Sequence, residues 1–544
     1  MLNYLKNKRA AAIANSEAEQ LEAQNRKERA QLQLSLTERA QAIFGAPAYT
    51  GASLTNRNLR GWVPDIGSGD ADTLESLETL RARSRDLYRN DAVACAALEA
   101  KKSSVVGTGL LLQSRPMARL LGWSTEQAQD WARKVEDEFS LWADNTDCDI
   151  TRHDDFYGLQ RLVFLSTLMS GDCFTLLPYK PRKKCVYDLR VKIIEADRCC
   201  NENNMADNSR CAAGIWRDAD GAPAYYSFRQ VHPGSYFTDD PNYNKWVRVA
   251  AFGARTGRRN VLHHFVRIRP ETARGVPILA PIMELCKQQS RYRRAEVDAA
   301  VLNSFLAIFV KRSTPGGEPL ADSFAEFSAM APAAVPPAGK NELRVGGASV
   351  IGLNPDEDIT SVAPNHPNAQ FDTFVNSLCE QIGASIGVPK EILLKSFKAS
   401  YSASRAALLE AWRHFSECRS WMISSFCQPV YEEWLAEAVL KGRVFAPGFF
   451  EDPALRAAYS GATWVGPGMG QINPQQEAAG LLTLVQDLKI LSRSEARSVY
   501  DGGDWESALS QMAWENAQME ATGLASAQAQ RGASTLPEMR DDDE

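Results

Sequence analysis

Apolar residues recur at intervals of three and four along a segment in the second half of the chain. The stripe consists of Phe371, Phe374, Val375, Leu378, Ile382 and Ile386. This spacing places all of them on one face of an amphipathic helix. Gly387 and Pro389 predict its end, because glycine is flexible and proline lacks a backbone donor and fixes φ.

A basic loop and a second, longer helix are predicted to follow. The loop contains Lys395, Ser396, Lys398, Ser400 and Tyr401. Ser402 or Ser404 can cap the helix after it. That helix has a long apolar face formed by Leu408, Trp412, Phe415, Met422, Phe426, Val430 and Trp434.

Two interpretations of this region remain open from spacing alone. It can be a plain helical hairpin with a solvated loop, or the loop can project its two lysines toward a phosphate backbone. Pro429 is expected to bend the second helix, because a proline inside a helix removes one hydrogen bond and clashes one turn back.

The first half of the chain reads as an α+β module over 60–276. Thr73 is expected to cap a helix that contains an arginine-rich stretch over 79–90. Amphipathic helices are predicted over 124–143, capped by Ser124 or Thr125, and over 154–170.

Strands follow in the same module. Leu189, Val191 and Ile193 alternate with polar residues, as in a half-buried strand. Residues 214–228 read as a hairpin with Asp220-Gly221 at its turn. Two more strands, over 246–252 and 261–268, complete a sheet that we expect to be antiparallel.

A long helix is predicted from Pro277, which suits a first helical turn, to about Arg312. Its two ends are apolar, but its middle is basic and contains Lys287, Arg291, Arg293 and Arg294. A long helix with a solvated, basic middle does not fit a single compact core. It favours a strut that connects two modules and contacts the same helix in other copies of the chain. The three arginines could contact DNA or pair with Glu296 or Asp298 of a neighbouring copy.

Composition narrows the class of protein. The chain has 544 residues, 44% of them hydrophobic and 24% charged, which is typical of several folded modules. Its net charge of -6 argues against tight binding of nucleic acid over the whole surface, but not against an acidic channel with a few local cations. No signal peptide and no membrane span are expected.

Known catalytic and metal-binding motifs are absent from the sequence. It has no Walker A motif, no Gly-x-Ser-x-Gly and no His-Glu-x-x-His. One module is rich in cysteine and histidine, namely Cys173, Cys185, Cys199, Cys200, Cys211, His232, His263 and His264. Their spacing lacks the pairs that build zinc sites, so we interpret them as structural thiols and core histidines. The pair Asp154-Asp155 is expected to cap a helix rather than to bind magnesium.

Several long motifs resemble lambda-type phage portal proteins. The most specific are residues 79–110, which end in Val-Val-Gly-Thr-Gly-Leu, and residues 382–410, which include Ile-Gly-Val-Pro-Lys-Glu-Ile-Leu and Ser-Tyr-Ser-Ala-Ser-Arg-Ala-Ala-Leu-Leu-Glu. Weaker matches are the hairpin at 214–228, residues 262–277 and the Gly/Pro-rich residues 464–477. In the last of these, Asn473 and Gln475-Gln476 depart from the family pattern. The resemblance covers roughly 60–520 in unbroken order.

The resemblance implies a mostly helical α+β portal fold around an axial channel. Its parts would be an N-terminal arm (1–59), a wing (60–276), a first stem helix (277–312), a clip (313–360), a second stem helix (361–389), a tunnel loop (390–403), a long kinked helix with a return segment to the wing (404–476), crown helices (477–524) and a disordered acidic tail (525–544).

The resemblance further implies a subunit without catalysis or cofactors. A ring, typically a dodecamer, would sit at one vertex of the virion head after assembly in the host cytoplasm. Double-stranded DNA would pass through it. The partners would be the terminase large subunit, the major capsid and scaffold proteins, and a head-completion or adaptor protein, with no membrane.

The residues expected to face DNA are Lys395, Lys398, Ser400 and Tyr401 of the tunnel loop. Lys287, Arg291, Arg293 and Arg294 of the stem are expected to contact DNA or a neighbouring copy. Two alternatives remain: a metal-dependent nucleic-acid enzyme that uses the Cys/His-rich module at 173–264, and a structural adaptor whose oligomer lacks an axial channel.

Overall fold

A computed structural model describes residues 49–53, 56–59, 61–306, 370–396, 401–468, 474–487, 489–500 and 505–521. The chain divides into two compact units, Met1–Asp72 and Thr73–Glu544. The described part of the first unit contains a 3-10 turn, Thr50–Ala52, and the first residues of α2. The predicted clip and acidic tail, and most of the predicted arm, lie outside the described residues.

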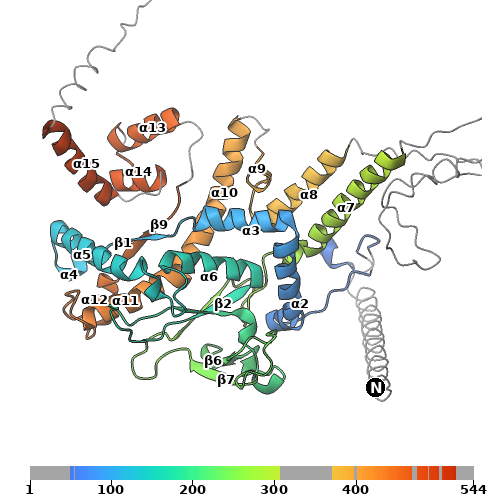
Figure 1. Cartoon of the computed structure of the whole chain (residues 1–544), viewed down its shortest axis with the longest axis horizontal. Coiled ribbons are helices and arrows are strands. Elements are labelled where there is room, and N and C mark those ends of the chain that lie inside the picture. The colour runs from blue at the N-terminus through green and yellow to red at the C-terminus, as the bar shows by residue number, and fades with distance from the viewer. Residues whose placement is uncertain are drawn as a thin grey trace, which may run out of the picture. The chain divides into compact units, whose positions relative to one another are not determined.

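Most of the regular structure is helical (Figure 1). The helices are α2 Gly69–Asn90, α3 Ala92–Val105, α4 Ala118–Leu121, α5 Thr125–Ala143, α6 Phe156–Ser170, α7 Met283–Leu306, α8 Phe371–Ile386, α9 Lys390–Leu393, α10 Tyr401–Met422, α11 Gln428–Leu440, α12 Pro453–Tyr459, α13 Pro474–Leu482, α14 Arg493–Tyr500 and α15 Trp505–Ala521. Two π-helical turns, Ile423–Cys427 and Thr483–Asp487, follow α10 and α13.

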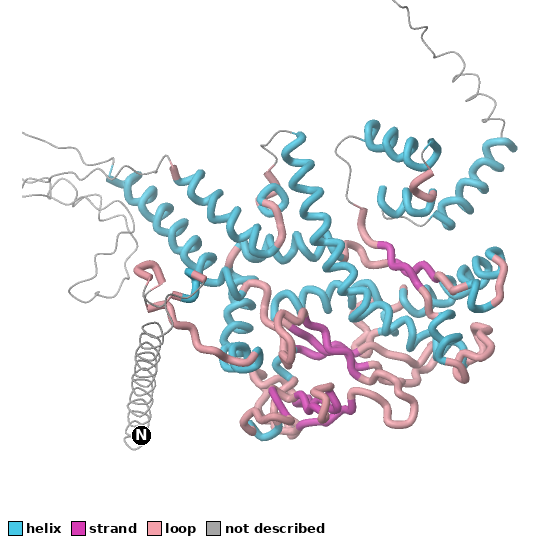
Figure 2. Tube along the Cα trace, turned by 180° about the vertical axis from the view of Figure 1, so that it is seen from behind, coloured by secondary structure: helices cyan, strands magenta, loops and turns pink. Residues whose placement is uncertain are grey.

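Three small antiparallel sheets accompany these helices. The strands are β1 Leu111–Ser114, β2 Asp172–Leu176, β3 Lys192–Glu195, β4 Cys211–Ala212, β5 Ile215–Arg217, β6 Pro223–Arg229, β7 Trp246–Ala250, β8 Val261–Phe265 and β9 Ala462–Val465. Their orders are β1-β9, β3-β2-β8 and β4-β5-β6-β7. Figure 2 shows the β2 sheet between the helices and the β4–β7 sheet.

Two hydrophobic cores hold these elements together. The larger core joins α3, α5 and α6 to α8, α10 and α11, and its centre is rich in aromatic rings, such as Phe139 packed against Trp434. The smaller core lies between the β2 sheet and the β6 sheet and includes Phe174, Tyr226 and Phe228. The predicted α+β module therefore has one core of its own and shares the other with the stem.

A buried carboxylate links the helices of this module to both of its sheets. Asp172, at the start of β2, is fully buried. It accepts hydrogen bonds from Arg81 of α2 at 2.7 Å and from Arg274 at 3.2 Å, and its other oxygen lies 3.1 Å from Nε2 of His263. Burial by itself would raise the pKa of Asp172, but Arg274 and Arg81 outweigh it and hold the pKa well below its usual range.

Arg274 carries this network further. Its guanidinium donates to the carbonyl oxygens of Cys199, Ala213 and Ala196 at 2.8, 2.8 and 2.7 Å. The side chain is 2% exposed, so the charge is taken out of water and satisfied by one carboxylate and three carbonyls. The segment that enters the first stem helix is thereby fixed to the loops around the sheets.

The structure confirms most predicted elements. Ser124 caps α5 with a capping box that includes Gln127, and Asp155 caps α6 through the N–H of Gly158. The 214–228 hairpin is present as β5 and β6, with Gly221 at φ +82° in its turn. The helices predicted near the C-terminus are present as α13, α14 and α15.

Three predicted starting points are wrong. Thr73 lies inside α2, whose first turn is instead capped by Ser68 through the N–H of Ala71. The first stem helix does not begin at Pro277 but with a 3-10 turn from Ala280 and an α-helix from Met283. α10 already begins at Tyr401, before either serine proposed as its cap.

Two further predictions need correction. The half-buried strand predicted at 189–193 is regular only from Lys192, and Arg190 is 1% exposed instead of facing solvent. The basic middle of the first stem helix is not exposed to solvent on every side, because Gln289 and Glu296 are buried.

Pro429 follows a π-helical turn, residues 423–427, within the long helix. The wider hydrogen-bonding pattern of that turn accommodates a residue without a backbone N–H.

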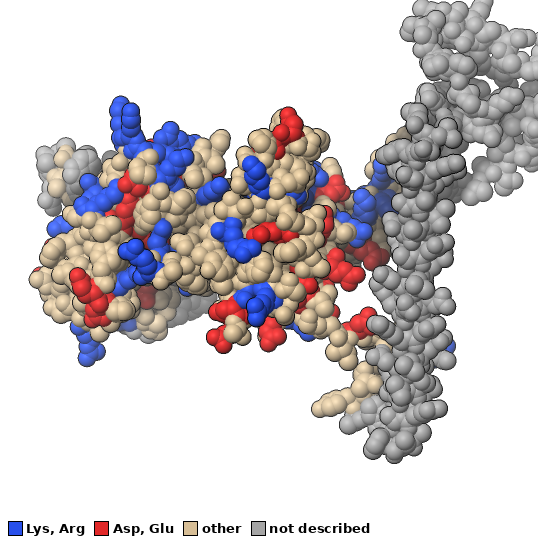
Figure 3. Space-filling view, turned by 90° about the horizontal axis from the view of Figure 1, so that it is seen from below, with Lys and Arg blue, Asp and Glu red and all other residues tan. Residues whose placement is uncertain are grey.

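Charges on the surface are mixed. On the face shown in Figure 3, lysine and arginine side chains lie among aspartate and glutamate side chains. No helix among the described residues has the length and hydropathy to cross a membrane.

We predict that Asp172→Asn lowers the free energy of unfolding by about 3–5 kcal/mol, because it removes the carboxylate that pairs with the buried Arg274 and leaves Arg81 with only the more distant Asp197, at 3.5 Å. Urea denaturation of the purified chain measures this. Asp130→Asn, at an exposed carboxylate that faces Arg133 on the surface of α5, should change the free energy by only about 0.5 kcal/mol. Equal effects of the two substitutions would contradict the assigned role of Asp172.

Candidate functional site

The second stem helix, α8, ends in a glycine turn. Gly387 has φ +72°, and the N–H of Val388 donates to the carbonyl of Gly383 at 2.9 Å, a Schellman-type closure. A Cβ on Gly387 would lie 2.2 Å from the ring of His414. Only glycine fits here, both for its backbone conformation and for its contact with α10.

The segment predicted as the tunnel loop, 390–403, begins with a short helix rather than with irregular chain. After Pro389, one helical turn forms α9, and the N–H of Ser396 donates to the carbonyl of Glu391 at 3.1 Å. This closure places Lys395 in the left-handed region, at φ +51°. A lysine in that conformation costs about 1 kcal/mol relative to glycine, so the backbone bears a small strain where the side chain is exposed.

A buried lysine connects the two flanks of this loop. Lys101, on α3, is 2% exposed. Its ammonium donates to the carbonyl of Ile386, at the end of α8, at 2.9 Å, and lies 2.8 Å from Nε2 of His414 on α10. One cation on the wing side therefore holds the chain on both sides of the loop, and it sits where the carbonyl end of a helix favours positive charge.

The protonation of this pair follows from its surroundings. Burial lowers the pKa of His414, and the charge of Lys101 lowers it further, while Glu417 acts in the opposite direction. Burial also lowers the pKa of Lys101. The arrangement fits a neutral imidazole that accepts a hydrogen bond from a protonated lysine.

The structure describes only part of the set proposed to face DNA. Lys395 is exposed and forms no ion pair with a described residue. Lys398 and Ser400 lie outside the described residues. Tyr401 is the first residue of α10, and its side chain is not described.

The cations of the first stem helix divide into two groups. Lys287, Arg291 and Arg294 are exposed and, at intervals of four and three, lie on one face of α7. Arg293 points elsewhere and pairs with Asp91, the N-cap of α3, at 3.2 Å. The structure thus gives Arg293 a partner within the chain and leaves the other three as an exposed stripe.

The Cys/His-rich module does not form a zinc site among the described residues. Its cysteines are free, and Cys173, Cys199 and Cys211 are buried in the folded module. His263 stacks between Phe174 and Phe265, with 4.3 Å between ring centroids on each side. These contacts support the interpretation as structural thiols and core histidines.

One set of three ligand-type groups does converge in the described part of the chain: Glu195, Asp197 and His232, with ligand atoms within 4.8 Å of one another. Arg85 already pairs with both carboxylates. His232 accepts the N–H of Gly234 at Nδ1, which leaves its Nε2 to carry a proton toward the carboxylates. This cluster is therefore a network of ion pairs and a poor fit for a metal.

Sequence reasoning missed Lys101 and His414, which fix the loop. Lys101 stands in a helix whose other polar residues are at least partly exposed, and nothing in its spacing distinguishes it from them. His414 lies within the long amphipathic pattern of α10, and its spacing does not distinguish it from the other polar residues of that helix. Only the approach of α3 to the end of α8 reveals their role.

We predict that the free energy of unfolding decreases as the pH falls below about 6.5. The pKa of His414 is lower in the folded state than in the unfolded state, so below about pH 6.5 the unfolded state binds a proton that the folded state does not. The stability that neutral His414 contributes is therefore fully present above that pH and is lost as the pH falls toward its folded pKa. His414→Gln keeps an acceptor for Lys101 but cannot take up a proton, and should lessen this pH dependence.

Urea denaturation at about pH 7.5 and about pH 5.5 measures the difference. Burial also lowers the pKa values of His263 and His264, so part of the dependence should remain in the variant. An unchanged dependence in His414→Gln would contradict the assigned protonation state.

Comparison with known proteins agrees with the motifs. The family described as "Phage portal protein, lambda family" matches residues 55–419. Portal protein B of Escherichia phage lambda is 25% identical over 497 residues, covering 88% of this chain and 90% of that protein. The portal protein of Escherichia phage N15 is 25% identical over 490 residues, covering 86% and 89%.

A chain from a solved structure titled "Virion of native gene transfer agent (GTA) particle" covers 78% of this chain and 92% of its own length, at 14% identity and a TM-score of 0.37. A likeness at that score carries no argument. The family match by itself confirms the expectation of a structural virion protein and gives no support to a metal-dependent enzyme. The chain belongs to the lambda family of phage portal proteins.

Proposed function

We propose that this chain assembles into a ring, as a dodecamer, at one vertex of the phage head, and that double-stranded DNA is packaged and ejected through its channel. The observation that carries this proposal is the family match over residues 55–419, a range that includes the segments predicted as wing, stem helices and tunnel loop. The proposed partners are the terminase large subunit, the major capsid and scaffold proteins, and a head-completion protein, met first in the host cytoplasm.

The stem helices support assembly with copies of the same chain. α7 and α8 lie side by side (Figure 1), and Tyr292 packs its ring against Phe371 and Phe374. The outer side of α7 nevertheless leaves Val297 59% and Val301 48% exposed. Apolar side chains on a projecting helix pair favour burial against a neighbouring subunit.

The tunnel loop suits a weak, sequence-independent contact with DNA. Lys395 and Lys398 would meet phosphates, and Ser400 and Tyr401 would add uncharged donors. Phosphate contacts of this kind do not read sequence, so DNA can slide past them. Lys101 and His414 would hold both flanks of the loop, so that a force on the loop is passed to the wing.

The exposed stripe on α7 offers a second set of contacts. Lys287, Arg291 and Arg294 could face DNA or acidic groups of the adjacent subunit. Arg293 is the weakest candidate for either contact, because Asp91 of its own chain already neutralises it.

We predict that Lys395→Ala combined with Lys398→Ala leaves rings intact but alters retention of packaged DNA. The change removes two cations from the loop and no described contact from the fold. Nuclease protection of DNA in heads, compared with the yield of rings, measures the effect. Lys395→Arg with Lys398→Arg is the matched control, which keeps both charges.

A second control separates the effect of losing the lysine charges from the effect of the strained backbone at position 395. Lys395→Gly combined with Lys398→Ala removes the same two charges and also relieves the left-handed conformation at position 395, so it should match the double alanine variant in retention while stabilising the fold relative to it by up to about 1 kcal/mol. Packaging and retention at wild-type levels in the double alanine variant would contradict the proposed role of the loop lysines.

A further inference from the structure

The connection between β6 and β7 presents two adjacent aromatic side chains to solvent. Tyr236 is 99% exposed and Phe237 is 74% exposed. The loop that carries them is well braced: the hydroxyl of Tyr243 donates to the carbonyl of Pro233, and Arg229 donates to the carbonyl of Tyr243, each at 2.7 Å. An ordered loop that holds two aromatic rings in water suggests a surface that another molecule covers.

An acidic residue follows these rings. Asp239 is exposed and forms no ion pair with a described residue, whereas Asp240 accepts the N–H of Asn242 and shapes the turn. The tip of the loop, residues 236–239, therefore combines apolar area with one free negative charge.

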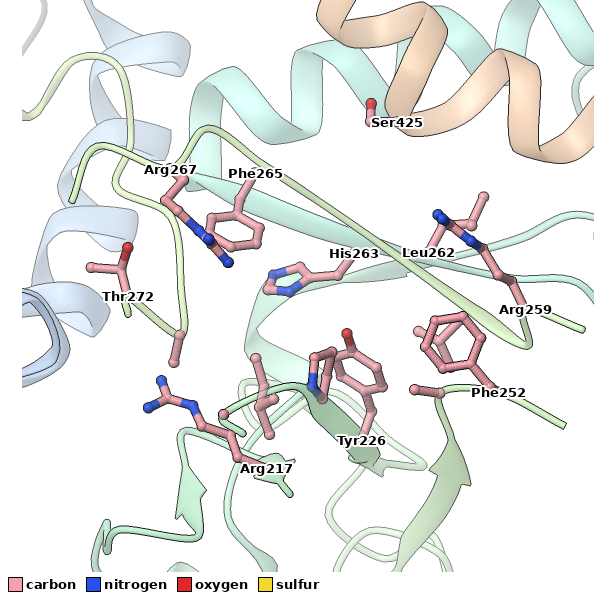
Figure 4. Close-up of a pocket in the computed structure, with 16 residues that line it drawn as sticks. Arg217, Tyr226, Phe252, Arg259, Leu262, His263, Phe265, Arg267, Thr272 and Ser425 are labelled. Atoms are coloured by element: carbon pink, nitrogen blue, oxygen red, sulfur yellow. The ribbon is translucent and has the colours of Figure 1, made fainter. Parts of the chain in front are cut away.

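A cavity of complementary character lies in the same module (Figure 4). It has a volume of about 270 Å³, and its apolar wall includes Val261, Leu262 and Phe265. Arg217, Arg259 and Arg267 also line it, and no carboxylate is among the lining residues. In Figure 4, Arg217 and Arg267 approach from one side of the cavity, and Arg259 lies with Phe252 on the other.

The tip and the cavity lie at opposite ends of one sheet. The cavity is lined by Pro223, the first residue of β6, and by Ala251, which follows the last residue of β7. The loop starts at the other end of these strands, after Arg229. Seven residues of β6 separate the two ends by about 20 Å at roughly 3.3 Å per residue, so the braced tip cannot enter the cavity of its own chain.

We propose that the tip at 236–239 of one subunit inserts into this cavity of the next subunit. Phe237 would meet the apolar wall and the arginine planes, and Asp239 would face the three guanidinium groups. A knob and a hole on different parts of one chain make a head-to-tail contact, and such contacts close into rings when the rotation between copies allows it. The inference rests on the proposed ring and assigns one of its subunit contacts.

Photo-crosslinking tests this contact. The full chain carrying p-benzoylphenylalanine at position 237 is assembled into rings, irradiated and digested, and the linked peptides are identified by mass spectrometry. We expect crosslinks between subunits that end on the segments 215–226, 251–273 or Ser425. Rings whose crosslinks fall elsewhere would overturn this contact and leave the portal function standing. Failure of the unmodified chain to form any ring would overturn both.

A charge exchange gives an independent measure. Arg267→Glu should raise the concentration needed for half-maximal ring assembly about tenfold, and adding Asp239→Lys to the same chain should restore most of the loss. Arg255→Glu is the matched control, since Arg255 is exposed near the cavity without lining it. Equal effects of the two single substitutions, or no rescue by Asp239→Lys, would overturn the proposed pairing.

Discussion

The arrangement of the wing depends on one buried carboxylate. Asp172 binds Arg81 of α2, Arg274 before α7 and His263 of β8, and the two arginines offset the cost of burying its charge. A buried charge is costly unless it is paired and hydrogen-bonded, so the network fixes which helix, which strand and which connection come together. The path from the wing into the stem follows from that constraint.

A second buried charge, Lys101, extends this rigidity toward the tunnel loop. It reaches the end of α8 and the body of α10 from a helix of the wing, and its carbonyl and imidazole partners lie on either side of the loop in sequence. Asp91 at the start of the same helix pairs with Arg293 of the first stem helix. α3 is thus the element that contacts both α7 and the two flanks of the loop between α8 and α10.

Periodicity was enough to predict the elements whose burial is one-sided. The stripe over 371–386, the capped helices α5 and α6 and the 214–228 hairpin all appear as expected, because local spacing and capping residues decide them. Long-range pairing was not predictable in this way. β1 pairs with β9 across some 350 residues, from Leu111 opposite Val465 to Ser114 opposite Ala462. The sequence of neither strand indicates which strand it pairs with.

The same limit applies to the candidate site. The loop lysines were recognised by resemblance, and Arg293 was grouped with its neighbours because charge spacing does not show that one arginine of a run turns inward. The inward turn of Arg190, the burial of Gln289 and the roles of Lys101 and His414 depend on tertiary partners that lie far away in sequence. Sequence therefore predicted many of the single elements, and the contacts between those elements required the structure.

The central claim is that copies of this chain close around a channel. Native mass spectrometry of the purified full-length chain, with negative-stain imaging of the same sample, tests it most directly. The account predicts closed rings of uniform mass with a central hole wide enough for duplex DNA. Oligomers without an axial hole, or a single monomeric or dimeric species at every concentration, would contradict it.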